Sequence, residues 1–134
     1  MENKLICLDT SVLIDFYRKK DKSKTYLYKL SLKYSLFAVT SVTVFEIFTG
    51  SDAIQNDFWG KFFQSKVILP FDFNAAKRAV IIDKELKALR KRIDIPDLFI
   101  AACATEHNLP LATLNIKHFQ RVKELEIVDK TLVM

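Results

Sequence analysis

A short apolar run that ends in a single carboxylate constrains the fold of this chain more than any other feature. Residues 5–8 are continuously apolar, and Asp9, Thr10 and Ser11 follow them directly. A run of this length without polar alternation predicts a strand buried on both faces, as in a parallel sheet covered by helices. Ligands of such sheets bind beyond the carboxyl ends of the strands, so Asp9 is placed where it can meet a metal ion or a phosphate.

Strand-like runs and helical periodicities alternate along the rest of the chain. Further strands are predicted over residues 36–39, 67–69 and 111–113, with a last edge strand at 127–128. Helices are predicted over residues 9–17, 25–34, 42–49, 53–64, 74–92 and 96–107, and a short turn or helix over 115–119. Asn74 is the expected cap of the longest helix and Asp52 of the helix before it. This alternation predicts an α/β fold with a mostly parallel sheet, in one domain over residues 1–134.

The composition excludes two kinds of site. Gly50 and Gly60 are the only glycines, so the chain has no glycine-rich phosphate loop of the P-loop or dinucleotide-binding type. Neither His107 nor His118 lies in the spacing of a zinc site, so zinc is not expected.

The same composition bears on location. Cys7 and Cys103 both lie in apolar runs, which predicts reduced core cysteines in a cytoplasmic protein. No long apolar segment follows the N-terminus, so no signal peptide is expected. The longest purely apolar run, residues 98–104, is too short to cross a bilayer, and no membrane association is expected.

The charge balance fits a polyanionic partner. Lys and Arg total 21 against 16 Asp and Glu, which gives a net charge of +5. The densest basic stretch closes the longest predicted helix, a few residues before Asp97, and consists of Lys87, Arg90, Lys91 and Arg92. These residues could track phosphates toward Asp97. The alternative is a solvated helix end, where cations are stabilised by the helix dipole.

Two further acids stand out by their surroundings. Glu46 lies in a helical run with apolar neighbours on both sides, so it either points out and pairs with a lysine or is held inside the protein by a specific partner. Asp97 begins an apolar helix after Pro96, where an acid is stabilised by the helix dipole even without any other function. Asp9 has a comparable alternative role as an N-cap.

The three acids together favour a metal site. Asp9, Glu46 and Asp97 can all face one crevice at the carboxyl edge of the sheet. Three carboxylates brought together would raise one another's pKa. A hard divalent cation such as Mg²⁺ removes that conflict, because it prefers oxygen ligands from one or two carboxylates, waters and phosphates.

Four stretches of the chain resemble the PIN-domain nucleases. They are residues 9–15, Glu46 in its helix, residues 96–104 and residues 111–119. Their order and spacing are similar, more narrowly, to VapC-type toxins of toxin–antitoxin pairs, over nearly the whole chain. The resemblance implies an α/β/α sandwich and a Mg²⁺-dependent endoribonuclease, with Mn²⁺ as a possible substitute, that cleaves structured RNA such as tRNA.

The resemblance also implies roles for individual residues. Asp9 and Asp97 match the acids that hold the metal, and Glu46 matches the acid that binds it through water or assists as a base. Ser11 and Thr113 match residues that shape the pocket. Many family members have a fourth aspartate where this chain has Asn115, which keeps an acceptor oxygen without the charge. His118 is a candidate RNA contact.

The expected partners are RNA, a cognate antitoxin whose C-terminal segment covers the active site, and a second copy of the chain. Two other functions remain open on the sequence. One is a non-catalytic RNA- or protein-binding module on the same fold, favoured by Asn115. The other is a phosphatase of the haloacid-dehalogenase type with Asp9 as nucleophile, which would need a second aspartate where Ser11 stands.

Overall fold

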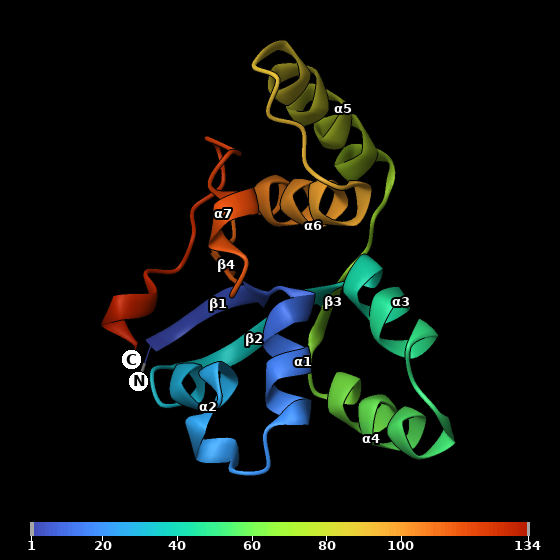
Figure 1. Cartoon of the computed structure of the whole chain (residues 1–134), viewed down its shortest axis with the longest axis vertical. Helices are drawn as coiled ribbons and strands as arrows, with labels where there is room; N and C mark the ends of the chain where they lie inside the picture. Colours follow the sequence, from blue (N-terminus) through green and yellow to red (C-terminus); the bar gives the residue numbers. More distant parts are fainter. Residues whose placement is uncertain (1, 134) are drawn as a thin grey trace.

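A parallel sheet between two layers of helices forms the protein (Figure 1), in a computed structural model that describes residues 2–133. Within these residues the strands are β1 (Glu2–Leu8), β2 (Tyr34–Thr40), β3 (Val67–Leu69) and β4 (Leu111–Ala112). They lie in the order β3-β2-β1-β4, and every pairing is parallel. The predicted α/β/α sandwich is therefore confirmed, and all the strands end at the same edge of the sheet.

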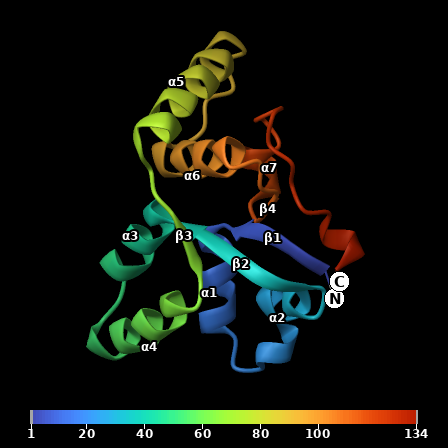
Figure 2. The same cartoon turned by 180° about the vertical axis from the view of Figure 1, so that it is seen from behind.

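The helices divide between the two faces of the sheet (Figures 1 and 2). One face is covered by α1 (Thr10–Arg18), α2 (Tyr26–Ser31) and α4 (Ala53–Gln64). The other face is covered by α5 (Phe73–Ala88), α6 (Ile95–Glu106) and the single-turn α7 (Ile116–Phe119). Helix α3 (Ser41–Thr49) follows β2 without a loop, and two short 3₁₀ turns span Lys22–Lys24 and Lys130–Leu132.

Strand β1 is buried from both sides, as its apolar run predicts. Ile6 and Leu8 pack into the core beneath α1, α2 and α4, while Cys7 points into the core beneath α5 and α6. Both cysteines are buried and free, which confirms their predicted place in the core. Burial raises the pKa of Cys103 to about 12, so this thiol stays protonated at neutral pH.

The predicted limits of the longest helix are wrong at both ends. Its cap is Asp72, whose side chain accepts a hydrogen bond from the Ala75 N–H (3.0 Å), and not Asn74. The helix ends at Ala88 instead of near residue 92, because Arg90 adopts a left-handed conformation (φ 56°) and the Lys91 N–H bonds back to the Leu86 carbonyl (2.8 Å). This Schellman-type ending is usually made by glycine, so the sequence gives no sign of it here.

Other boundaries differ less. Helix α2 ends at Ser31, and Tyr34 begins β2 instead of closing the helix. The predicted edge strand at 127–128 is reduced to a single parallel bridge between Ile127 and Leu111. Asp52 caps α4 through a complete capping box with Gln55, as the sequence predicts. None of the helices in the described part of the chain is long and apolar enough to span a membrane.

Leu13→Ala is expected to lower the free energy of unfolding by about 2–5 kcal/mol, since the truncation leaves a cavity in the core. Leu13 is fully buried on α1, the helix that carries Thr10 and Ser11 to the sheet edge. Urea unfolding measures the change. The matched control is Leu32→Ala, whose side chain is 64% exposed and whose effect should stay within about 0.5 kcal/mol. Equal losses in the two variants would contradict the assignment of the core.

Candidate active site

Three carboxylates meet at the carboxyl edge of the sheet. Asp9 follows β1 and is buried, Asp97 lies in the first turn of α6, and Glu46 lies half-buried on α3. The pKa of Asp97 is raised, first by burial, then by the negative charge of Asp9, and to a smaller degree by Glu46. The three acids therefore share one electrostatic environment, as the sequence predicts.

Two hydroxyl groups hold Asp9 in place. Ser11 Oγ donates to Asp9 Oδ2 at 2.7 Å, and Thr113 Oγ1 donates to the same oxygen at 2.8 Å. Ser11 Oγ in turn accepts the Leu114 N–H at 3.0 Å. Asp9 occupies the N-cap position of α1 but caps no helix N–H with its side chain, so a purely capping role is wrong. Since both hydroxyls use Oδ2, the other oxygen, Oδ1, is left for a ligand.

Glu46 is held by a threonine from a different helix. Thr10 Oγ1 donates to Glu46 Oε1 at 2.7 Å, and the hydroxyls of Thr10 and Thr43 lie 2.9 Å apart. Thr43 is fully buried, and its N–H is capped by Thr40 at the start of α3 (3.1 Å). No lysine or arginine among residues 2–133 forms an ion pair with Glu46, so the solvated lysine-paired alternative is wrong.

Sequence reasoning missed the role of Thr10 and Thr43. Thr10 was visible only as the first of two hydroxyls after Asp9, and nothing indicated that it reaches across to α3. Threonines in the first turn of a helix usually serve as caps, as Thr40 does. The pairing of Thr10 with Glu46 spans 36 positions and depends on how α1 and α3 are rotated against each other.

The segment after β4 contacts both Asp9 and Asp97. Thr113 holds Asp9, and its hydroxyl also accepts the Asn115 N–H at 2.9 Å. His118 Nδ1 lies 2.9 Å from Asn115 Nδ2 and 3.4 Å from Asp97 Oδ2. His118 partly offsets the rise in the pKa of Asp97. Asn115 is thus linked to Asp9 through Thr113 and to Asp97 through His118, and its supporting role stays a prediction.

The predicted basic contacts lie away from the acids. Lys87, Arg90 and Lys91 lie at the tip of α5, from which the chain runs back to reach Asp97 (Figures 1 and 2). Arg92 is engaged with Asp83 through two hydrogen bonds, from Nε at 3.1 Å and from Nη2 at 3.2 Å. Closeness in sequence to Asp97 therefore does not bring this basic group to the carboxylates.

The donor set suits a hard cation held by few protein ligands. In the described part of the chain, no three His, Cys, Asp or Glu side chains converge tightly enough to ligate one ion together. The charge of Asp9 raises the pKa of Asp97, and both residues offer carboxylate oxygens. Mg²⁺ usually takes one or two carboxylates and completes its coordination with water, so Asp9 and Asp97 are the residues that would hold it.

Comparison with known proteins gives a consistent result. The PIN domain family model matches residues 6–125. The chain is 30% identical to Ribonuclease VapC1 of Methanocaldococcus jannaschii, over 96% of this chain and 90% of that protein. It is also 30% identical to Ribonuclease VapC of Rickettsia bellii, over 95% of this chain and 97% of that one.

Solved structures share the fold. A toxin–antitoxin complex from Klebsiella pneumoniae contains a chain that is 25% identical, with a TM-score of 0.75 over 93% of this chain and 97% of that one. A DNA-bound VapBC from Salmonella typhimurium superposes with a TM-score of 0.82 at 23% identity, over 96% of this chain and 99% of that one.

Asp97→Asn is expected to raise the melting temperature of the metal-free protein at neutral pH by a few degrees. The pKa of Asp97 is raised in the folded state, so its favourable contribution is complete only below the ordinary aspartate pKa and is lost as the pH rises through the raised value. Asparagine never ionises. The difference between variant and parent should therefore vanish in acid and grow toward neutral pH, as thermal unfolding in chelator between about pH 3 and 8 would measure.

The matched control for this prediction is Asp57→Asn. Asp57 is exposed and pairs only with Lys61 at the surface of α4, so its loss should have little effect or slightly destabilise the protein. A metal-free Asp97→Asn protein that melts below the parent at neutral pH would contradict the repulsion inferred among the acids.

Proposed function

The chain belongs to the PIN-domain family and, within it, to the VapC ribonucleases, and from this premise we propose that it is a Mg²⁺-dependent endoribonuclease and the toxin of a toxin–antitoxin pair. The family supports an RNA-cleaving hydrolase. The observation that carries the proposal is the convergence of Asp9, Glu46 and Asp97 with hydroxyl donors and no neutralising lysine or arginine in the described structure. Such a site is suited to an ion and not to a buried salt bridge.

The residues around the site have separate tasks. Asp9 and Asp97 would hold the ion, Mg²⁺ or Mn²⁺, while Ser11 and Thr113 fix the orientation of Asp9. When bound, the ion supplies charge neutralisation at the phosphate and lowers the pKa of water. Glu46 has one oxygen occupied by Thr10, so its Oε2 is available to take the proton of the attacking water as the P–O bond breaks.

The substrate proposed is an exposed loop in a structured RNA such as tRNA, cleaved in the cytoplasm. The net charge of +5 supports a polyanionic substrate. Lys87, Arg90 and Lys91 lie apart from the acids, so they would contact only an RNA large enough to reach the tip of α5. His118 is next to Asp97, so any contact that it makes with RNA would be close to the cleaved phosphate.

The proposed partners are an antitoxin and a second copy of the chain. An antitoxin partner is supported by the toxin–antitoxin complex that shares this fold, and we expect the C-terminal segment of the antitoxin to cover the active site. A homodimer is supported by exposed apolar side chains beside the site. Phe45 is 68% exposed and lines, with Ile95 and Phe99, an apolar hollow of about 320 Å³ between α3 and α6.

Purified protein is expected to cut total cellular RNA into discrete products in Mg²⁺ or Mn²⁺ and to leave it intact in chelator. Glu46→Gln removes the proposed base and should lower the rate by about 10²–10⁴-fold while Mn²⁺ affinity changes little. Asp9→Asn and Asp97→Asn should lower both Mn²⁺ affinity and cleavage. RNA gel analysis and calorimetric Mn²⁺ titration provide the two measurements.

Asp57→Asn is the control, because it removes an exposed carboxylate of α4 outside the site. The alternative of a non-catalytic binding module would be favoured by two results together. Well-folded, antitoxin-free protein would not cleave RNA, and its Mn²⁺ affinity would be the same in Asp9→Asn and Asp97→Asn as in the parent. The neutral Asn115 in place of a fourth acid is the observation behind that alternative. Cleavage that survives both substitutions would show that the acid site is wrong.

Phe45→Asp is expected to weaken self-association by tenfold or more, because it replaces an aromatic ring of the proposed apolar contact by a charged carboxylate. Light scattering coupled to size-exclusion chromatography over a range of protein concentrations measures the change. The control is Ile54→Asp on α4, which introduces the same charge at a side chain that is 80% exposed. A dimer that is unaffected by Phe45→Asp, or a parent protein that remains monomeric, would refute this interface.

A further inference from the structure

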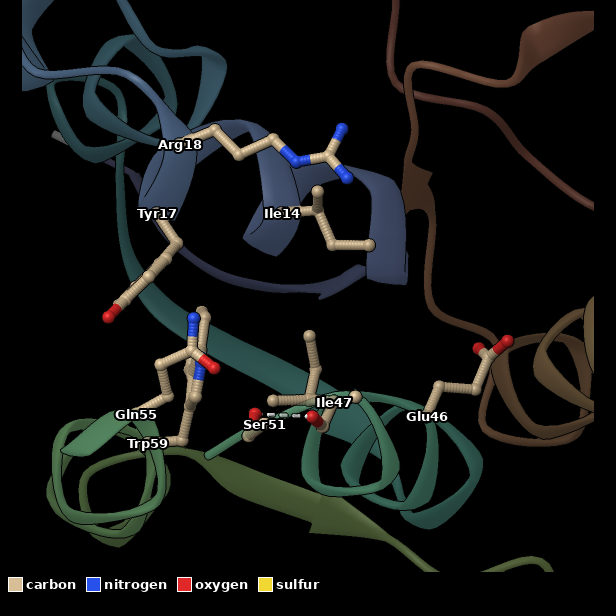
Figure 3. Close-up of a pocket in the computed structure, with 9 residues that line it drawn as sticks. Ile14, Tyr17, Arg18, Glu46, Ile47, Ser51, Gln55 and Trp59 are labelled. Atoms are coloured by element: carbon tan, nitrogen blue, oxygen red, sulfur yellow. Dashed lines mark hydrogen bonds between the residues drawn. The ribbon is translucent and has the colours of Figure 1, made fainter. Parts of the chain in front are cut away.

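A cavity of about 450 Å³ lies between α1, α3 and α4 and reaches Glu46 at one end (Figure 3). This volume falls in the range of pockets that bind small organic ligands, roughly 300–1,000 Å³. Nothing in the mechanism above uses the part of the cavity beyond Glu46, where Tyr17, Arg18, Gln55 and Trp59 line it.

One wall of the cavity is aromatic and rigid. Tyr17 and Trp59 lie with ring centroids 5.6 Å apart at an interplanar angle of 35°. Trp59 is almost fully buried and is fixed by edge-on contact with Phe62, at 5.2 Å between centroids. Trp59 also stacks on Phe63, at 5.8 Å and 26°, so the half-buried ring of Tyr17, supported by Trp59, is the surface that can stack on a nucleobase.

Beyond Glu46, two side chains offer hydrogen-bond donors to the cavity, Gln55 and Arg18. Gln55 Oε1 accepts the Asp52 N–H at 2.9 Å in the capping box, which fixes the amide so that its NH₂ group is free to donate. Arg18 forms no ion pair with any acid among residues 2–133. Figure 3 shows the Gln55 amide turned toward the same space as Tyr17, with Glu46 at the opposite side.

We propose that this cavity is a subsite for the base of the nucleotide next to the cleaved phosphate, selective for uracil or guanine, which carry a carbonyl where cytosine or adenine carries an amino group. The proposal rests on the ribonuclease function above, which places the phosphate beside Glu46. Unstacked bases of single-stranded RNA are recognised by stacking on aromatic rings and by hydrogen bonds to their edges. The Gln55 NH₂ matches a carbonyl oxygen and opposes the amino group that cytosine or adenine carries in the same place.

Trp59 is the only tryptophan of the chain, so its fluorescence reports on the cavity directly. Hexauridylate and hexacytidylate are titrated into the protein in chelator, where no cleavage is needed. The bases of these probes differ at two adjacent positions: uracil has a carbonyl at C4 and a proton on N3, and cytosine has an amino group at C4 and a lone pair on N3. We expect saturable quenching by both, with hexauridylate bound about three- to tenfold more tightly, the range set by one hydrogen bond.

Gln55→Glu is the decisive variant. A glutamate can still accept the Asp52 N–H, so the capping box is kept, but the donor in the cavity becomes an acceptor. The preference should therefore reverse toward hexacytidylate. Gln64→Glu makes the same change at an exposed position on the same helix and should keep the parent's preference for hexauridylate.

Each outcome bears on a separate conclusion. Equal affinity for the two probes in the parent, or the same preference in parent and Gln55→Glu, would overturn the base subsite even if RNA is cleaved. If Gln64→Glu also reversed the preference, the reversal would come from added negative charge in general, and the base subsite would be overturned as well. Quenching by the antitoxin but by neither oligonucleotide would assign the cavity to a protein partner. Base-selective quenching in a protein that cleaves no RNA would keep the subsite and refute the nuclease.

Discussion

Repulsion among three carboxylates at one edge of the sheet is the constraint around which this structure is arranged. The parallel strands bring Asp9 to the same edge as α3 and α6, and the charge of Asp9 adds to the effect of burial in raising the pKa of Asp97. Among residues 2–133, no lysine or arginine pairs with these acids to relieve the repulsion. The structure surrounds the acids with neutral hydroxyl donors instead, which satisfy one oxygen of Asp9 and one of Glu46. Neutral donors fix the carboxylates in place without competing with a cation for their charge.

Rigid packing on both sides of the sheet makes this arrangement possible. The strand that carries Asp9 is buried on both faces, and the helix that carries Asp97 continues into a run of fully buried small residues, from Ala101 to Ala104. Because those residues are small, α6 can lie close to the sheet, and its first turn is brought to the carboxyl edge. The unfavourable charge at the site is thus opposed by apolar burial elsewhere in the same elements.

The three acids could be singled out from the sequence, because both the topology of a parallel sheet and the apolar surroundings of a carboxylate can be inferred from it. Asp9 and Asp97 follow from where a parallel sheet places the ends of its strands and the starts of its helices, Glu46 from its apolar neighbours, and the resemblance to a known family implied their roles. Contacts that depend on rotation or on an unusual backbone were not predictable. Thr10 reaches Glu46 only because α1 and α3 face each other in one register, and Arg90 ends α5 in a conformation that glycine usually adopts. The end of α5 also decides where the basic residues before Asp97 lie, and their contact with RNA stays a prediction.

The segment after β4 shows how a departure from the family pattern can be compensated locally. A fourth aspartate at position 115 would add a negative charge where the pKa of Asp97 is already raised by its neighbours. Asn115 adds none, and it contacts His118, which lies beside Asp97 and lowers the pKa of that carboxyl. The same short segment holds Asp9 through Thr113. One continuous stretch of chain therefore contacts both of the acids proposed to bind the metal, and the neutral residue within it adds no further charge to their repulsion.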